Sequence, residues 1–346
     1  MFNKLKAELD AELKKLISHI DKKYGLKSSS GPLYKSLKDF ILRGGKRLRP
    51  ILFMTAFRGF SRKNPKNLFR CALATELLHD FLLIHDDIID KSALRRGKPS
   101  MHYMLKKYIP RNKNLRFGGE DLAIVAADII FSIAVESFLS VEENSLRKEK
   151  ALLKFIESAS YTGCGEFIEI MYTGSSLEKI RKDTIYKIYD YKTAYYTFAA
   201  PLAAGAILAG AQDEEVEKLS RYGIYLGRAF QIKDDILGIF ADDKKTGKPG
   251  ISDIQEAKKT LLIWRAYKNS PPKDKLQIKR VLNKKNAGKK DLIAMRRIIK
   301  QSGSLEYAKK ETKRFFRKSI ETIKTSRMKR IYKEELIKYS SNIINI

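Results

Sequence analysis

The feature that most constrains the fold is a set of apolar runs that are too long for β-strands. Residues 68–90 read "LFRCALATELLHDFLLIHDDIID", and comparable runs occur in "EDLAIVAADIIFSIAVESFLSV" and "LSRYGIYLGRAFQIKDDILGIF". Strands rarely exceed about ten residues, and segments that alternate apolar and polar residues are hard to find. Proline and glycine fall between the long runs, where they would end helices. The pattern predicts an all-α protein with many helices.

The length of 346 residues suits one large domain or two ordinary ones. No repeat recurs at a fixed period, so we expect one domain over residues 1–346. Towards the C-terminus, "NSPPKDKLQIKRVLNKKNAGKKD" is rich in lysine and resembles a linker. Helix is predicted to resume at "SLEYAKKETKRFFRKSIETIK".

Several features favour a soluble, cytoplasmic protein. Cys71 and Cys164 lie far apart in apolar or mixed surroundings, which is typical of buried, reduced thiols. The N-terminal segment lacks the apolar stretch of a signal peptide. We also expect no run approaching the about 20 apolar residues that a membrane span needs.

The net charge of +30 is unusual, and the last 82 residues hold 25 basic and 7 acidic residues. Three explanations remain open: nucleic-acid binding, attraction to an anionic membrane or to phosphorylated substrates, and solvated helix faces in a lysine-rich chain. No zinc-finger, KH or RNP-like pattern is present. We therefore expect no nucleic-acid partner.

Three aspartates end the apolar run at residues 68–90. On an ideal helix Asp86 and Asp90 lie one turn apart on nearly the same face, and Asp87 is turned by about 100°. Like charges at this spacing repel each other. A helix cap would need one acid and not three, which favours a Mg²⁺ site completed by water and phosphate oxygens.

Basic residues follow and precede this cluster. Arg95 and Arg96 supply guanidinium groups that match phosphate oxygens. Upstream, "ILRGGKRLRPIL" places two glycines before Lys46 and Arg49, where the backbone can approach a phosphate closely. Taken alone, this segment is more commonly explained as an ordinary basic loop between helices.

A similar combination of acidic and basic residues occurs in the second half of the chain. The segment "GRAFQIKDDILGIF" ends a helical run with Asp234 and Asp235, while Asp242 and Asp243 are more typical of a helix end or turn. In "YDYKTAYYTFAAP", Lys192 stands in an apolar, aromatic run. A lysine in such a place either extends to solvent or faces an anion.

Together these segments resemble the trans-isoprenyl diphosphate synthases, or polyprenyl synthetases. The similarity covers about residues 30–325 and contains five motifs in the order of the family: "GGKRLRP", "HDDIIDKSALRRGKPSMH", "YKT", "GRAFQIKDDILG" and "TGKPGISDIQEAKKT". The resemblance implies an all-α bundle around a deep apolar cavity, usually as a homodimer. It also implies Mg²⁺-dependent addition of isopentenyl diphosphate to an allylic diphosphate (dimethylallyl, geranyl or farnesyl).

The resemblance also implies site residues. The ligands of about three Mg²⁺ ions would be Asp86, Asp90 and Asp234, supported by Asp87 and Asp235. The contacts to the allylic diphosphate would be Arg95, Lys192, Lys248 and Lys258. The isopentenyl diphosphate site would be Lys46, Arg49, His79 and Arg96. The groups facing the allylic cation would be Thr193, Gln231 and the Lys192 carbonyl.

The chain departs from the family pattern at three positions. Gly238 stands where the second acidic motif usually has an aspartate, although glycine also occurs there among archaeal-type members. Gln255 and Ala257 replace the arginine and glycine that are frequent in the last motif. Phe81, with Leu82 beside it, resembles the cavity floor of geranylgeranyl-type (C20) enzymes, and the alternative is that Phe81 is an ordinary core residue.

Other functions would share some of these features. A farnesyl or longer-chain synthase would share every motif. A class I terpene cyclase needs no isopentenyl diphosphate pocket, which "GGKRLRP" argues against. A non-catalytic synthase subunit tends to lose the aspartates that this chain keeps. The basic C-terminal region is expected to allow peripheral association with anionic membrane.

Overall fold

The structure, a computed structural model, describes the chain except for residues 111–113, 241–251, 285 and 345–346 and the side chains of residues 252 and 253. The chain forms two compact units. The N-terminal unit comprises Met1–Leu153 and Ala204–Ala211, and the C-terminal unit comprises Lys154–Ala203 and Gln212–Ile346. The prediction of a single domain stays a prediction.

Helices account for nearly all regular structure in the described part of the N-terminal unit. They are α1 (Phe2–Tyr24), α2 (Leu26–Ser29), α3 (Gly31–Ile41), α4 (Leu48–Phe60), α5 (Leu68–Ile89), α6 (Met101–Lys106), α7 (Gly119–Leu139), the first part of α8 (Ser145–Thr173) and the end of α10 (Ala200–Leu208). The strands β1 (Leu94–Arg95) and β2 (Lys98–Pro99) form a small antiparallel hairpin after α5. The all-α prediction is confirmed.

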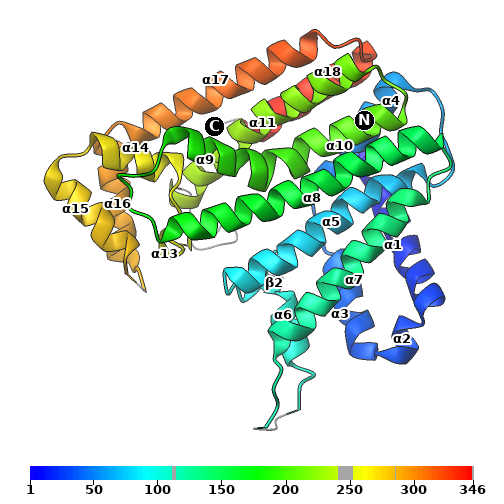
Figure 1. The fold of residues 1–346 in the computed structure, drawn as a ribbon, viewed down its shortest axis with the longest axis horizontal. Coiled ribbons are helices and arrows are strands. Elements are labelled where there is room, and N and C mark those ends of the chain that lie inside the picture. The colour runs from blue at the N-terminus through cyan, green and yellow to red at the C-terminus, as the bar shows by residue number, and fades with distance from the viewer. Residues whose placement is uncertain (111–113, 241–251, 285, 345–346) are drawn as a thin grey trace. The chain divides into compact units, whose positions relative to one another are not determined.

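Helix α5 carries the first acidic cluster and packs against α7 (Figure 1). It is apolar on most of its circumference, as expected of a buried helix. The buried face of α7 is rich in small residues, including Ala123, Ala126 and Ala127, which lets the two helices approach closely. This packing fixes the direction in which α5 presents its last turn.

Helix α7 is more apolar over its length than we expected of any segment of the sequence. By length and composition it qualifies as a membrane span, with a mean hydropathy of 2.1, although the sequence was expected to hold no such run. Within that window 44% of the residues are buried, and they include the face that contacts α5. Ile124, Val125 and Leu139 remain exposed.

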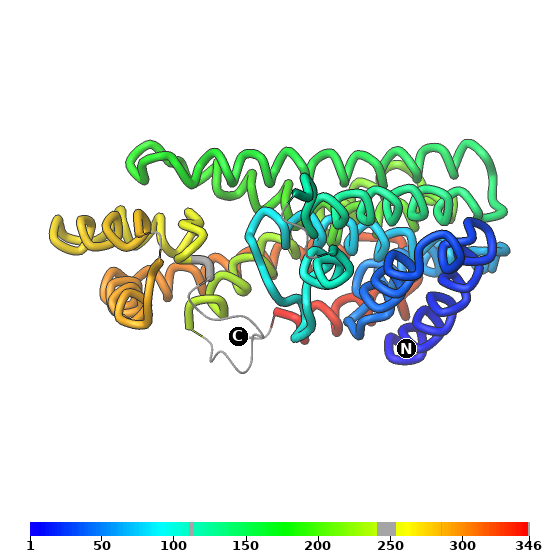
Figure 2. The backbone as a smooth tube through the Cα atoms, turned by 90° about the horizontal axis from the view of Figure 1, so that it is seen from below, coloured from blue at the N-terminus to red at the C-terminus, as the bar shows by residue number. Residues whose placement is uncertain are grey.

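The described elements of the C-terminal unit are the rest of α8, α9 (Lys182–Tyr189), the π-helix η1 (Asp190–Ala199), the start of α10 (Ala200–Leu208), α11 (Asp213–Phe240), α13 (Ser252–Gln255), α14 (Leu261–Asn269), α15 (Pro272–Leu282), α16 (Lys289–Gln301), α17 (Ser304–Lys324) and α18 (Arg330–Ile344). Helix α11 packs against η1 and α17. Helices α14, α15 and α16 contact one another at one end of this unit (Figure 2).

Glycines allow the close approach of α11 to η1. A Cβ on Gly227 would lie 2.3 Å from the Ala194 Cβ, and one on Gly223 would lie 2.6 Å from the Ala199 backbone. Such distances are too short for any side chain. The two glycines therefore set the spacing of the pair of elements that carries Thr193, Gln231 and Asp235.

Two local expectations were wrong. The lysine-rich segment at residues 269–291 contains helix α15 and not only a linker. Pro272 is tolerated in its first turn, and Ile278, Val281 and Leu282 are buried at helical spacing. Cys71 is buried as expected, but Cys164 is exposed, and both thiols are free.

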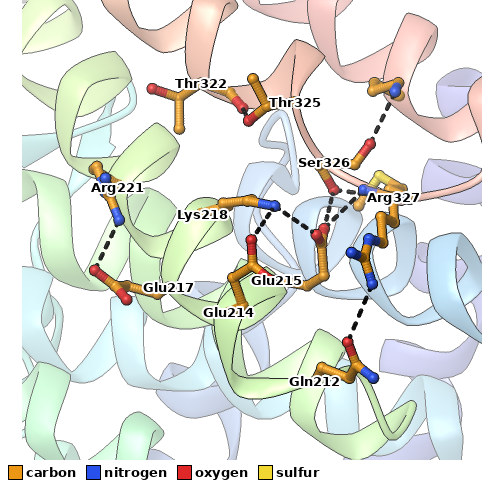
Figure 3. Close-up of polar contacts among 12 residues, drawn as sticks. Gln212, Glu214, Glu215, Glu217, Lys218, Arg221, Thr322, Thr325, Ser326 and Arg327 are labelled. Carbon is orange, nitrogen blue, oxygen red and sulfur yellow. Dashed lines mark hydrogen bonds and ion pairs between the residues drawn. The ribbon is translucent and has the colours of Figure 1, made fainter.

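A buried carboxylate anchors the turn between α17 and α18. Glu215, at the start of α11, accepts hydrogen bonds from the Ser326 hydroxyl at 2.6 Å, the Arg327 backbone N–H at 2.8 Å and the Lys218 ammonium at 2.9 Å (Figure 3). Its neighbour Glu217 is exposed and pairs with Arg221 (Figure 3). Glu215 thus ties the turn between α17 and α18 to the start of α11, in addition to the packing of α17 along α11.

We predict that Glu215→Ala lowers the free energy of unfolding by about 2–3 kcal/mol, because it leaves the buried Ser326 hydroxyl and the Arg327 backbone N–H without this acceptor. The matched control Glu217→Ala removes an exposed ion pair and should cost at most about 0.5 kcal/mol. Urea unfolding followed by circular dichroism measures both. Equal effects of the two substitutions would contradict this role of Glu215.

Candidate active site

The first acidic cluster stands at the C-terminal end of α5. The Asp90 N–H donates to the Asp86 carbonyl oxygen at 2.8 Å, so the two side chains rise one turn apart, as predicted. The Asp87 side chain is fully buried, whereas that of Asp86 is 23% exposed. Carboxylates are unfavourable at the negative end of a helix dipole. Their concentration here therefore indicates a role other than stabilising α5.

Arg95 on the β1–β2 hairpin binds two of these carboxylates. Its Nη2 lies 2.8 Å from Asp86 Oδ2, its Nε donates to Asp87 Oδ1 at 2.8 Å, and Nη2 also bonds Asp87. Burial alone would lower the pKa of Arg95, but the bonds to Asp87 and Asp86 raise it above its usual value. The predicted neighbours Asp86, Asp87 and Arg95 are therefore brought together.

Sequence reasoning missed Arg43, which holds the hairpin in place. Its buried guanidinium donates to the Pro99 carbonyl at 2.8 Å and the Arg95 carbonyl at 3.4 Å. It also forms two hydrogen bonds with Asp39, at 2.8 and 3.1 Å. Arg43 thus positions the segment that carries Arg95 and Arg96. The only sequence signal was its place before the two glycines.

Within "GGKRLRP" the basic residues have different environments. Arg47 is buried and pairs with Glu76 at 3.0 Å and Asp10 at 2.8 Å, which makes it a structural residue. Lys46 and Arg96 are exposed, while Arg49 is buried. The carbon that a side chain would add to Gly45 would lie 3.2 Å from Arg96 Nη1. The loop therefore approaches the tip of the hairpin, as a shared anion site requires.

His79 lies about two helical turns before Asp86 on α5 and is half-buried. Burial, followed by the positive charges of Arg49 and Arg96, lowers the pKa of His79 well below its ordinary value. The imidazole is therefore neutral at pH 7. A neutral imidazole can donate one hydrogen bond to a phosphate oxygen without adding charge.

The second acidic cluster uses its two aspartates differently. Asp234 is exposed on α11, whereas Asp235 is buried. Asp235 accepts hydrogen bonds from the Tyr189 hydroxyl and from Gln231 Nε2, the latter at 2.9 Å. Burial and the nearby Asp235 raise the pKa of Tyr189 well above its usual value, so Tyr189 stays a donor. Of the two aspartates, it is Asp234 that faces solvent in a manner suited to a metal ligand.

Thr193 and Gln231 lie together, as their assigned roles require. The Thr193 hydroxyl donates to Gln231 Oε1 at 2.7 Å. Because Gln231 Nε2 is held by Asp235, the orientation of the amide is fixed from both sides. Thr193 lies in the π-helix η1, a form often found at functional sites.

Lys192, also in η1, pairs with two acids that sequence reasoning missed. Glu166 and Glu169 on α8 contact its ammonium group. Gly165 makes this approach feasible, since a Cβ there would lie 2.6 Å from the Lys192 backbone nitrogen. Glu166 and Glu169 stand three apart in a helical run, a spacing that carries no specific signal in sequence.

The last motif is described in part. Lys258 pairs with Glu256, and the Gln255 amide donates to the Ala287 carbonyl at 3.2 Å. Ala257 has a φ of 52°, in the left-handed region that favours the glycine frequent at this place. Lys248, Asp242 and Asp243 lie outside the described residues. Gly238 lies within α11, one turn after Asp234.

Phe81 and Leu82 are both half-buried on α5. The Phe81 ring lies 5.1 Å from the ring of Phe131 on α7 and 4.7 Å from that of His85, measured between centroids. Phe81 is thus held by aromatic neighbours in the turn below Asp86. This placement suits a rigid wall, and it equally suits core packing.

The donor set fits Mg²⁺. Mg²⁺ takes hard oxygen ligands and is usually bound through one or two carboxylates with water and phosphate oxygens. Asp86 and Asp90 provide such a pair, and no group of three or more acids, histidines or cysteines suited to a metal occurs among the described residues. A pair of carboxylates suits Mg²⁺ that shares the oxygens of a diphosphate.

Comparison with known proteins identifies the family. A family model described as polyprenyl synthetase matches residues 31–299. A short chain isoprenyl diphosphate synthase from Methanocaldococcus jannaschii is 31% identical over 309 residues, covering 87% of this chain and 83% of that protein. A geranylgeranyl diphosphate synthase from Saccharolobus solfataricus is 32% identical, covering 91% and 90%.

A solved structure agrees on the fold. Geranylgeranyl pyrophosphate synthase from Corynebacterium glutamicum, in complex with isoprenyl diphosphate and magnesium, superposes with a TM-score of 0.89 at 24% identity, covering 100% of this chain and 99% of that one. The chain belongs to the polyprenyl synthetase family and is a trans-prenyltransferase. The substrates of this family are isopentenyl and allylic diphosphates, and its members use Mg²⁺.

The lowered pKa of His79 predicts a pH-dependent stability. Because the folded protein keeps His79 neutral, its contribution is complete above the unfolded pKa of about 6.5 and is lost as the pH falls below it. Each pH unit costs up to about 1.4 kcal/mol. His79→Gln should flatten the loss of unfolding free energy below pH 6.5, measured by urea titrations, whereas the exposed His19→Gln should not. Parallel curves for wild type and His79→Gln would contradict this.

Proposed function

We propose that the protein condenses isopentenyl diphosphate with an allylic diphosphate to form all-trans geranylgeranyl diphosphate (C20). The observation that carries the proposal is the pair Asp86 and Asp90 at the end of α5, with Arg95 bonded to the same cluster. Geranylgeranyl diphosphate synthases among the relatives support the product. A farnesyl or longer-chain product is the alternative.

In the N-terminal unit the residues act on the departing diphosphate. Asp86 and Asp90 would hold Mg²⁺, which, when bound, neutralises the negative charge that develops on the leaving group. Arg95 now neutralises Asp86 and Asp87, and a metal at Asp86 would take over that task. The guanidinium of Arg95 would then be available to bind the diphosphate in bidentate fashion.

Lys46, Arg49, His79 and Arg96 would bind the diphosphate of isopentenyl diphosphate. The neutral His79 can donate a hydrogen bond, and the cations supply the compensating charge. No side-chain base is assigned to the final loss of a proton. The released diphosphate is the acceptor in this proposal.

In the C-terminal unit the fixed oxygens of Thr193 and Gln231, with the Lys192 carbonyl, would face the allylic cation. An amide locked by Asp235 and Thr193 needs no reorganisation as positive charge develops. Lys192, Lys248 and Lys258 would bind the allylic diphosphate, and Lys192 would leave Glu166 and Glu169 to do so. Asp234, supported by Asp235, would complete a set of three Mg²⁺ ions.

We also propose a cytoplasmic homodimer. Apolar side chains are exposed along α7, including Val125, and along α8, including Leu146, Phe167 and Met171. A second copy would cover such residues, which are costly in water. Peripheral association with anionic membrane through the basic C-terminal helices remains part of the proposal.

The first test is an assay with Mg²⁺, labelled isopentenyl diphosphate and each allylic primer. We expect a C20 product, complete loss of activity with EDTA, and a fall in kcat/KM of at least about 100-fold for Asp86→Asn or Asp90→Asn, because transition-state charge is no longer stabilised. The exposed Asp183→Asn is the matched control. Absence of a prenyl product with every primer would refute the function.

Phe81→Ala tests the chain-length role. If Phe81 is the floor of the product cavity, the variant should release products longer than those of the wild type, as resolved by chromatography. Phe53→Ala removes a fully buried core ring and should cost about 3–5 kcal/mol of stability without lengthening the product. An unchanged product from Phe81→Ala would mean that Phe81 is core only.

A further inference from the structure

A second cationic site adjoins the hairpin in the N-terminal unit. A cavity of about 640 Å³ opens beside the last turns of α3 and the strand β2. Five cationic side chains and one carboxylate line it: Lys35, Lys38, Arg43, Arg96, Lys98 and Asp39. Of the residues assigned to isopentenyl diphosphate, only Arg96 belongs to this lining. The cavity is therefore a separate site that shares one arginine.

The single carboxylate does not offset the positive charge. Asp39 is bound by Arg43 through two hydrogen bonds and by Lys98 at 3.3 Å. Burial would raise the pKa of Asp39, but these two partners outweigh burial and lower it. Asp39 thus stays ionised and serves to fix Arg43 and Lys98. Lys35, Lys38 and Arg96 remain as the charges that face an incoming anion.

Hydrogen bonds hold the Arg43 side of this cavity in a fixed position. The Arg43 side chain is 3% exposed and is held by Asp39, by the Pro99 carbonyl at 2.8 Å and by the Arg95 carbonyl at 3.4 Å. Its own carbonyl accepts a hydrogen bond from Arg47 Nη2 at 2.9 Å. A fixed wall with exposed lysines at the rim is suited to bind a small, highly charged anion.

We propose that this cavity binds inorganic diphosphate, the by-product of each condensation, and that a bound diphosphate withdraws Arg96 from isopentenyl diphosphate. Among the described residues that line the cavity, Leu42 has the one apolar side chain, so this lining offers little surface to a prenyl tail. A free diphosphate, with its high charge density, matches several cations at once. The regulatory consequence rests on the proposed function, whereas the binding itself does not.

The binding test is calorimetric titration of the full chain with inorganic diphosphate in EDTA, which removes metal-dependent sites. Lys35→Gln/Lys38→Gln should lose one binding event or weaken it at least about tenfold. Lys4→Gln/Lys14→Gln on α1 removes the same charge outside the cavity and should match the wild type. Equal binding by both double variants would overturn the proposal. A loss seen only with isopentenyl diphosphate would overturn the choice of free diphosphate.

The kinetic test separates this site from the proposed function. Without added diphosphate, Lys35→Gln/Lys38→Gln should keep the kcat and KM of the wild type. With added diphosphate, its inhibition constant against isopentenyl diphosphate should rise at least about fivefold relative to the α1 control. An unchanged inhibition constant would overturn the withdrawal of Arg96. If no variant has prenyltransferase activity, the proposed function fails while the calorimetric result still decides the binding site.

Discussion

The arrangement of the N-terminal unit depends on the ion pairs between Arg95 and the carboxylates that end α5. Three acids at the negative end of a helix repel one another and the helix dipole. Arg95 offsets this repulsion through Asp86 and Asp87. In the proposed function the same guanidinium would bind a diphosphate once a metal neutralises the acids. One charge would then contribute both to the stability of the unliganded protein and to the affinity for the substrate.

A second layer of arginines explains why the basic loop contains more cations than a substrate needs. Arg47 forms ion pairs with Glu76 and Asp10. Arg43 pairs with Asp39 and donates hydrogen bonds to carbonyl oxygens of the hairpin. Both are almost fully buried, where an unpaired charge would be costly. Their task is to fix the loop and the hairpin relative to α5. Lys46 and Arg96 are left at the surface, available to an anion.

Features that depend on local periodicity could be predicted from the sequence. The apolar run at residues 68–90 predicted the helix α5, and helical spacing placed Asp86 and Asp90 on one face of it. The π-helix η1 and the pairing of Lys192 with Glu166 and Glu169 were not predicted. A π-helix has no distinct periodic signal, and the ion pair joins elements that only tertiary packing brings together. Helix α15 was not predicted, because the many lysines of this segment indicated a linker and only three apolar residues mark its buried face.

In the second acidic cluster, Asp235 and Asp234 have different environments. The Asp235 side chain accepts hydrogen bonds from Tyr189 and Gln231, so it fixes the amide of Gln231, one of the groups proposed to face the cation. Gly238 lies one turn after Asp234, where an aspartate would stand as Asp90 stands to Asp86. The C-terminal unit thus offers one outward carboxylate on this face of α11. A metal held there would take more of its oxygens from water and diphosphate, and its affinity would depend more strongly on the substrate than that of a metal at Asp86 and Asp90.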